Sequence, residues 1–306
     1  MSVRSLVIDK LPGGLAIPYV DVQGTADGPH LTVIAGVHGT EYTSIAAVRE
    51  FARELDPDRV SGRITAVPLV NLPAFWARSP FVVPADGKNL NRSFPGDPDG
   101  TYAEVLAHHL FQNFVVGTDY LIDCHAGDLP EALEPFTIYE ESPVEEPARD
   151  LAYAYGLGHV VRQPADARTV AGSTCAAAAD IGVAAIIAES GQNGIVDRVA
   201  IDRHLAGLAN VARHLGVLPG EVVASDPPRE HAGWHWLQTP VAGWWQPAVP
   251  VGTAVEAGAL LGEVSEILGD VVHECRAPEA GAVLFLTSSP AVTADGLLLG
   301  LARNGR

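Results

Sequence analysis

His38 and Glu41 lie three residues apart in the segment GVHGTE at residues 36–41, directly after an apolar run. An imidazole nitrogen and a carboxylate oxygen are both good zinc ligands, and a catalytic zinc takes three protein ligands and a water. Positions i and i+3 at the start of a helix face the same side, so both side chains can reach one ion. The alternative is a loop histidine followed by an acidic residue in the first turn of a helix. The pair indicates a zinc site if a third ligand lies elsewhere in the chain.

The third ligand that the sequence offers is His125, which follows the apolar run 120–124. Ligands of open α/β sheets bind beyond the carboxyl ends of the strands, so residues far apart in sequence can meet there. Asp123 lies two residues before His125, on the same face of the predicted strand. A carboxylate beside a metal-bound histidine can hold its tautomer and orientation, which makes Asp123 a candidate to support His125. The alternative for Asp123 is a hydrogen-bonded acid in the core, and Cys124 should point to the opposite face.

Glu189 ends the apolar run 184–188 and is the candidate general base. An apolar wall raises the pKa of a carboxyl group toward the range that is useful for proton transfer. In a metal-assisted hydrolysis, Glu189 would take a proton from the attacking water and deliver it to the leaving nitrogen. The alternative is a salt-bridged residue at the end of a strand.

A polar loop at residues 86–96 contains the candidates for substrate recognition, Asn91 and Arg92. A guanidinium group binds a carboxylate through two parallel hydrogen bonds, and an arginine held beside an asparagine suits that task. The alternative is a surface loop with an exposed arginine. Arg78 lies upstream and is a candidate to polarise a carbonyl oxygen of the substrate.

Apolar runs of strand length alternate with longer helical patterns from residue 31 to about residue 216. The predicted strands are 31–36, 63–70, 119–124 and 182–188, and the predicted helices are 43–55, 101–116, 147–157 and 196–215. This alternation is typical of an α/β domain with a largely parallel sheet that helices cover on both faces. Three of these strands lead into His38, His125 and Glu189, so the expected fold gathers them at one edge.

The pattern changes after residue 215, where short β-like runs are separated by glycine and proline. These runs are 243–245, 260–265, 271–275, 282–285 and 297–302. They predict a second, all-β domain, which would be a small barrel or sandwich. We expect an α/β domain over residues 1–222 and a C-terminal β domain over residues 223–306. The second domain would shape the mouth of the site or support oligomerisation.

The composition limits the classes of partner. The formal net charge is −18, and no cluster of Lys or Arg is available to neutralise phosphates, which argues against nucleic acid. No apolar stretch approaches the roughly 18 residues of a membrane span, and the first residues make a poor signal peptide. The three cysteines are odd in number and far apart, which favours reduced thiols and a cytoplasmic protein.

Four segments together resemble the succinylglutamate desuccinylase/aspartoacylase family, a branch of the zinc carboxypeptidase superfamily. They are GVHGTE at 36–41, NLNRSFPG at 89–96, DCH at 123–125 and AESG at 188–191, in the family's order. The resemblance implies a zinc-carboxypeptidase-like mixed sheet covered by helices, plus a small C-terminal all-β domain.

The same resemblance implies roles for individual residues. It implies one Zn2+ per chain, bound by His38, Glu41 and His125. It also implies that Glu189 is the general base and that the pair at positions 91 and 92 binds the substrate carboxylate. The family's oxyanion-stabilising arginine is best matched by Arg78, although proline stands at position 80, where another arginine is expected.

The expected activity is that of a zinc-dependent amidohydrolase, which removes an acyl group from an N-acyl amino acid or a related small carboxylate-bearing amide. One alternative is a carboxypeptidase or dipeptidase that uses the same zinc site, and a β domain that narrows the mouth disfavours it. A non-catalytic binding protein on a hydrolase fold is the other, and the presence of all three ligands and the base argues against it. The expected partner is a small molecule, with no nucleic acid and no membrane, and a homo-oligomer is left open.

Overall fold

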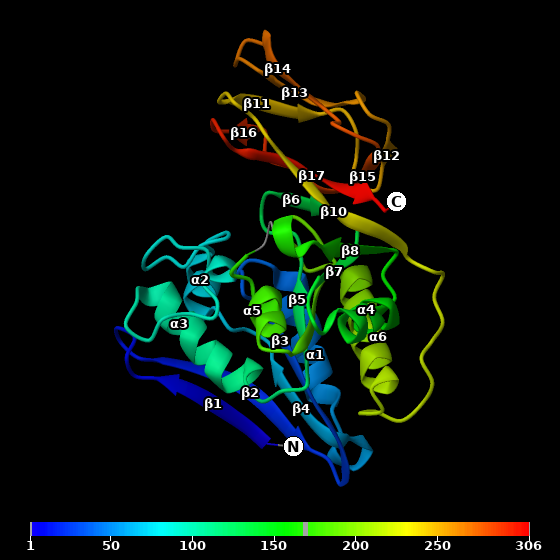
Figure 1. The fold of residues 1–306 in the computed structure, drawn as a ribbon. Helices are drawn as coiled ribbons and strands as arrows, with labels where there is room; N and C mark the ends of the chain where they lie inside the picture. Colours follow the sequence, from blue (N-terminus) through cyan, green and yellow to red (C-terminus); the bar gives the residue numbers. More distant parts are fainter. Residues whose placement is uncertain (1, 168–170, 306) are drawn as a thin grey trace.

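The computed structural model describes residues 2–167 and 171–305, and a long twisted sheet runs through them (Figure 1). Its strands up to residue 189 are β1 (Ser2–Ile8), β2 (Leu15–Gln23), β3 (Ala26–Ala35), β4 (Ser61–Val67), β5 (Tyr120–His125), β6 (Glu131–Leu133), β7 (Phe136–Glu140), β8 (His159–Gln163) and β9 (Ala184–Glu189). The helices between them are α1 (Tyr42–Glu54), α2 (Leu72–Ala77), α3 (Tyr102–Leu110), α4 (Glu145–Tyr155), α5 (Thr174–Asp180) and α6 (Arg198–His214). Short turns of helix add η1 (Pro57–Arg59), η2 (Leu90–Arg92) and η4 (Ala165–Ala167), and η3 (Phe111–Val115) continues α3.

The remaining strands all follow α6. They are β10 (Arg229–Gln238), β11 (Gly243–Pro247), β12 (Ala254–Val255), β13 (Leu260–Ser265), β14 (Val271–Arg276), β15 (Gly281–Thr287), β16 (Ala291–Val292) and β17 (Leu297–Asn304). No helix occurs among the described residues after α6, so the predicted all-β character of this region is confirmed.

The large sheet is mixed, in the order β1-β2-β4-β3-β5-β9-β7-β8-β10-β17-β15-β12. Its centre is parallel, because α1 crosses over from β3 to β4 and α3 crosses over from β4 to β5. Parallel pairing also joins β7, β8 and the start of β10, but β7 runs antiparallel to β9 and the edge strands β1 and β2 are antiparallel, so the expectation of a largely parallel sheet holds only in part. A second sheet, β14-β13-β11-β16, packs beside the C-terminal end of the first (Figure 1).

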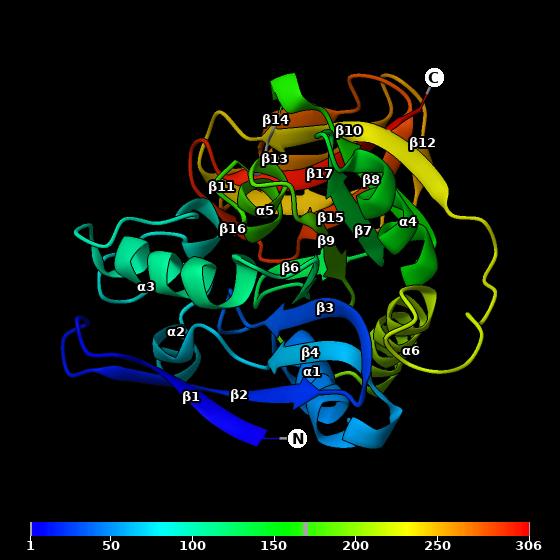
Figure 2. The same cartoon turned by 60° about the horizontal axis from the view of Figure 1, so that its bottom comes forward.

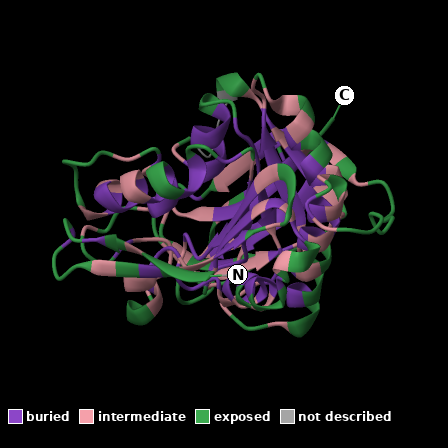
Figure 3. Ribbon diagram, turned by 90° about the horizontal axis from the view of Figure 1, so that it is seen from below, coloured by how far each residue is buried: buried purple, intermediate pink, exposed green. Residues whose placement is uncertain are grey.

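Side chains alternate across the central strands and build a core on each face of the sheet. Leu121 and Ile187 point into the core that α3 and α5 cover, whereas Ile122 and Ile186 point into the core beneath α1, α4 and α6. Figure 2 shows these two groups of helices on either side of the sheet, and Figure 3 shows that the strands between them are buried. This alternation decides which face receives the polar residues at the strand ends.

The C-terminal region shares both sheet and core with the rest of the chain. Strand β10 pairs in parallel with β8 through its first residues and antiparallel with β17 through the others. The core on the α3 side includes Trp234 and Phe285, and the ring of Trp234 lies 5.1 Å from that of Phe136. A boundary between residues 222 and 223 falls in an exposed segment before β10, and it stays a prediction.

Two further observations concern the expected environment. The three cysteines are free and buried, as the sequence predicted. Among the described residues, no helix is both long enough and apolar enough to cross a membrane.

Candidate active site

His38 and Glu41 lie in the turn that links β3 to α1, where a sharp chain reversal brings them to the carboxyl edge of the sheet. A Cβ on Gly39 would collide with the backbone of Ala74 and Phe75, so this close approach requires glycine. Glu41 is the N-cap of α1 and is buried. Its Oε1 lies 2.6 Å from Nδ1 of His38, so the predicted pair meets in the structure.

His125, the last residue of β5, completes the cluster. Its Nδ1 lies 3.0 Å from Oε2 of Glu41. One ligand atom each from His38, Glu41 and His125 lies within 4.8 Å of the others, and no other such group of metal-ligating side chains occurs among the described residues. The three residues predicted from the sequence therefore lie together in one site, although 84 positions separate Glu41 from His125.

Both imidazoles are held at the nitrogen that faces away from Glu41. Nε2 of His38 lies 3.1 Å from Oδ1 of Asn89, and Nε2 of His125 lies 3.1 Å from Oδ2 of Asp123. With a metal bound, a proton kept on each Nε2 would leave the lone pair of Nδ1 free for the ion, which is the tautomer that a metal ligand needs. Two such nitrogens and one carboxylate match the donor set of a catalytic zinc site, so these residues fit the ion.

Asp123 is in turn held by its neighbours. It is fully buried, and the hydroxyl of Thr174 on α5 donates to its Oδ2. Because Asp123 and His125 lie on the α5 face of β5, the carboxylate reaches the imidazole along one side of the strand. This placement agrees with the support that the sequence predicted for His125, and Cys124 points into the opposite core as expected.

The charges within the cluster favour an ionised Glu41. Burial alone would raise its pKa, but the imidazoles of His125 and His38 outweigh burial and hold the pKa at about 2. Burial would likewise lower the pKa of His125, and the carboxylates of Asp123 and Glu41 raise it well above its usual range. Two imidazoles and two carboxylates thus meet in a space that water barely reaches.

Glu189, the last residue of β9, lies beside His125 in the register of the two strands. Its Oε2 is buried and has no hydrogen-bond partner among the described residues. Burial raises the pKa of Glu189 to about 8, and the nearby carboxylates of Glu41 and Glu131 contribute to the increase. An unpartnered carboxyl group beside the cluster is placed to exchange a proton with a reacting molecule.

The carbonyl groups next to these residues are fixed by His204 of α6. Its Nε2 lies 3.1 Å from the carbonyl oxygens of both His125 and Ser190, and the Tyr155 hydroxyl lies 2.7 Å from its Nδ1. Burial lowers the pKa of His204 to about 4, so the ring is neutral at pH 7 and donates from Nε2 while it accepts at Nδ1. His204 thereby ties the ends of β5 and β9 together.

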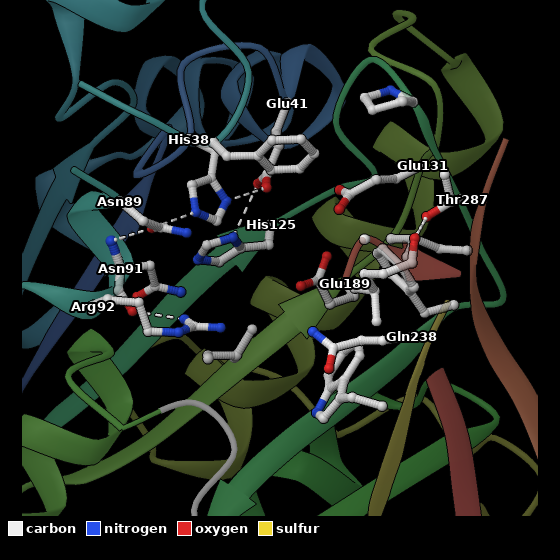
Figure 4. Close-up of a pocket in the computed structure, with 18 of the residues that line it drawn as sticks. His38, Glu41, Asn89, Asn91, Arg92, His125, Glu131, Glu189, Gln238 and Thr287 are labelled. Atoms are coloured by element: carbon white, nitrogen blue, oxygen red, sulfur yellow. Dashed lines mark hydrogen bonds and ion pairs between the residues drawn. The ribbon is translucent and has the colours of Figure 1, made fainter. Parts of the chain in front are cut away.

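The cluster opens into a cavity of about 630 Å³, shown in Figure 4. One wall comes from the α/β part, including Ile138 and Ile187, and the facing wall comes from the C-terminal strands and the loop between β16 and β17. Among the residues of this facing wall are Trp236, Gln238 and Thr287. The C-terminal region therefore contributes part of the cavity wall, and its role in shaping the mouth of the site stays a prediction.

Asn91 and Arg92 belong to η2 and line this cavity. Asn91 is buried, and its Oδ1 accepts a hydrogen bond of 3.3 Å from the backbone N–H of Thr174. Arg92 donates to the carbonyl oxygen of Asn91 at 2.7 Å, and its other guanidinium nitrogens have no partner among the described residues. The free side of the guanidinium is available for a ligand.

Arg78 is a predicted site residue that the structure does not bring to the cavity or to the cluster. It is the C-cap of α2 with a φ of 52°, its side chain is exposed, and it is absent from the lining. Its role in stabilising an oxyanion stays a prediction.

Sequence reasoning missed Asn89 and Glu131. Asn89 is two residues before Asn91 in a loop without periodicity, so nothing marked it as the partner of His38. Glu131 opens β6, a three-residue strand that pairs with β15 and is too short to leave a pattern. An acidic residue six positions after His125 was the only available signal.

The comparisons with known proteins agree with this geometry. The model of the succinylglutamate desuccinylase/aspartoacylase catalytic domain matches residues 27–215. The chain belongs to this family. A curated relative, the N-alpha-acetyl-L-2,4-diaminobutyric acid deacetylase of Halomonas elongata, is 28% identical over 263 residues, which are 83% of this chain and 75% of that protein.

Solved structures of the desuccinylase/aspartoacylase family have the same fold as this chain. A succinylglutamate desuccinylase/aspartoacylase from Rhodobacter sphaeroides has a TM-score of 0.86 at 25% identity, covering 99% of this chain and 94% of its own. The product-bound ectoine utilization protein EutE (DoeB) from Ruegeria pomeroyi has a TM-score of 0.85 at 25% identity, with the same coverage. Desuccinylases and deacetylases are hydrolases that remove an acyl group from an amide.

Proposed function

We propose that this protein is a zinc-dependent deacylase that hydrolyses the amide bond of a small N-acyl amino acid. The observation that carries the proposal is the cluster of His38, Glu41 and His125, with the unpartnered carboxyl group of Glu189 beside it at the wall of one cavity. The relatives with named activities remove acetyl or succinyl groups, which supports the same reaction class here. The free and buried thiols support a reducing compartment, so we propose the cytoplasm.

Different residues of the site would carry out different parts of the hydrolysis. A zinc ion held by His38, Glu41 and His125 would supply Lewis acidity toward the substrate carbonyl and the attacking water. Glu189 accepts a proton from that water and returns it to the leaving nitrogen, because a carboxyl group with a pKa of about 8 can hold and release a proton near neutral pH. Asp123 keeps the His125 ring in the orientation that presents Nδ1.

Arg92 supplies the orientation of the substrate. Its guanidinium group lines the cavity with free N–H donors, which can bind a carboxylate through two parallel hydrogen bonds. A carboxylate held there fixes the amide relative to Glu189, and such positioning lowers the entropic part of the barrier. The C-terminal wall limits the cavity to about 630 Å³, which suits a small amide better than a long peptide.

A hydrolysis screen with zinc-loaded protein tests the proposal. The substrates are N-acetyl and N-succinyl amino acids and N-acyl diamino acids, with release of the free amine as the readout. We expect turnover of at least one class, loss of that turnover on chelation and its return on addition of zinc. Undiminished turnover by metal-depleted protein would reject the zinc-dependent mechanism.

A further inference from the structure

Glu131 presents a carboxylate to the cavity at a point that the proposed chemistry does not use. It is the first residue of β6 and pairs with Thr287 of β15, so it lies where the two parts of the chain meet. Its Oε2 accepts a hydrogen bond of 2.8 Å from the backbone N–H of Asp128. Its Oε1 has no hydrogen-bond or ion-pair partner among the described residues.

After burial, the charges that act most strongly on Glu131 are those of other carboxylates. Burial raises the pKa of this carboxyl group well above its usual range, and the charges of Glu41 and Asp128 contribute to the increase. Among the described residues that line the cavity, Arg92 is the one arginine, and there is no lysine. Figure 4 shows Arg92 and Glu131 on opposite sides of the cavity, with His125 and Glu189 drawn between them.

The neighbouring groups exclude two simpler roles for Glu131. It is not part of the metal cluster, whose members among the described residues are His38, Glu41 and His125. Nor does Asp128 need it as a partner, because the Asp128 carboxylate already accepts bonds from Thr40 and from the backbone. With its raised pKa the side chain can take up a proton when the cavity is empty, and a cationic ligand that pairs with Oε1 would stabilise the ionised carboxylate instead.

We propose that Glu131 binds a primary ammonium group of the substrate while Arg92 binds its carboxylate. The inference rests on the proposed function and narrows its substrates to small amides that carry both charges. The ammonium group has two possible sources: the side chain of the amino acid that is released, as in an N-acyl diamino acid, or the acyl group itself, as in an aminoacyl amide.

Pairs of substrates with the same size and shape, one with an ammonium group and one with a methyl group, isolate the effect of the charge on turnover. Nα-acetyl-2,4-diaminobutyrate and Nα-acetylnorvaline differ by an ammonium in place of a methyl group on the amine side. Glycyl-alanine and N-propionyl-alanine differ in the same way on the acyl side. The ratio of kcat/KM within each pair measures the preference for the charge, and the pair with the larger ratio identifies its source.

We expect zinc-loaded wild-type protein to prefer the ammonium member of one pair by roughly 10-fold to 100-fold, the size expected for a hydrogen-bonded charge pair. Glu131→Gln should lose most of that preference, because its amide can still accept the Asp128 N–H bond but cannot balance a cation. The matched control is Glu134→Gln, which changes a glutamate three residues away that does not line the cavity. This control should keep the wild-type ratio.

Calorimetric binding of the products gives a second measurement that needs no turnover. 2,4-Diaminobutyrate and norvaline represent the amine side, and glycine and propionate represent the acyl side. The same Glu131-dependent preference is expected in binding. The inference would be overturned if the ammonium and methyl members of both pairs reacted and bound equally well, or if a preference for the ammonium member survived in Glu131→Gln. Hydrolysis of these amides would still support the proposed function in either case. Failure to hydrolyse any of the four amides would count against the proposed function, and product binding would still decide the role of Glu131.

Discussion

Replacing His204 with alanine should destabilise the protein strongly, because the imidazole joins three buried groups. Nε2 bonds the carbonyl oxygens of His125 and Ser190, and Nδ1 accepts from the Tyr155 hydroxyl. Each buried polar group that loses its partner costs about 1–3 kcal/mol. Three such groups set the expected loss at about 3–9 kcal/mol, and the cavity left by the ring adds to it.

Urea unfolding of the wild type and the variant, followed by far-UV circular dichroism, measures this loss. A loss of this size is a large share of the roughly 5–15 kcal/mol that stabilises a typical domain. His204→Gln should recover part of the loss, because its side-chain amide can donate toward the same carbonyl oxygens. His214→Ala is the matched control, since it makes the same substitution at an exposed position of the same helix. It should change the free energy of unfolding by less than about 0.5 kcal/mol.

The reasoning would be refuted if His204→Ala and His214→Ala had equal effects. That result would mean that the ends of β5 and β9 are held by their backbone ladder alone, without help from α6. A second readout is zinc affinity, which should fall in His204→Ala because the His125 backbone loses its anchor, and which should stay unchanged in His214→Ala.

Four further substitutions test the remaining parts of the site. His125→Ala should lose most of the bound zinc while far-UV circular dichroism stays native, and full zinc occupancy by metal analysis would reject its role as a ligand. Glu189→Gln should retain zinc but lose roughly 10²-fold to 10⁴-fold in kcat, the range for general acid–base catalysis, and near-normal turnover would make it structural. Arg92→Lys should raise KM for carboxylate-bearing amides more than for their methyl esters, because lysine cannot form the planar two-point contact; an equal effect on both would move carboxylate recognition elsewhere. Gly191→Ala should cost about 2–5 kcal/mol of stability in urea unfolding, since Gly191 has a φ of 101° and a Cβ would lie 2.7 Å from Cβ of Thr43; an unchanged midpoint would show that this turn relaxes.

The central sheet and the metal cluster could be predicted because their signals are local. The run before His125 is apolar on both faces apart from Asp123, as a buried parallel strand requires, and it ends in a polar residue. The same pattern precedes Glu189. The edge strands β1 and β2 were missed because their apolar residues fall in short groups: β1 is largely exposed and its apolar run covers residues 6–8 alone, and β2 is interrupted by a proline. Strands β7 and β8 were missed because a strand of five residues leaves little period to read.

The residues that depend on tertiary contacts could not be predicted. Asn89 acquires its role only because the loop after α2 folds back on His38, and Glu131 only because β6 pairs with a strand from the other end of the chain. Arg78 is the opposite case: its position in the sequence suggested a site residue, whereas in the structure it is the exposed C-cap of α2, and its role stays a prediction. Residue types and the ends of strands can be predicted from the sequence, whereas the contacts between side chains across the cavity depend on the three-dimensional fold.

Strand β10 is hydrogen-bonded to β8 at one end and to β17 along the rest, so the chain cannot be shortened to a minimal catalytic fragment. A truncation after residue 222 would remove β10, one of the two neighbours of β8, and would uncover Phe136, whose ring packs against Trp234. A strand edge with unpaired backbone groups, next to an exposed aromatic ring, can pair with other chains and promote aggregation. Any transplant of the cavity wall between family members would therefore have to be made within the loops of residues 239–296, with β10 and β17 left in place.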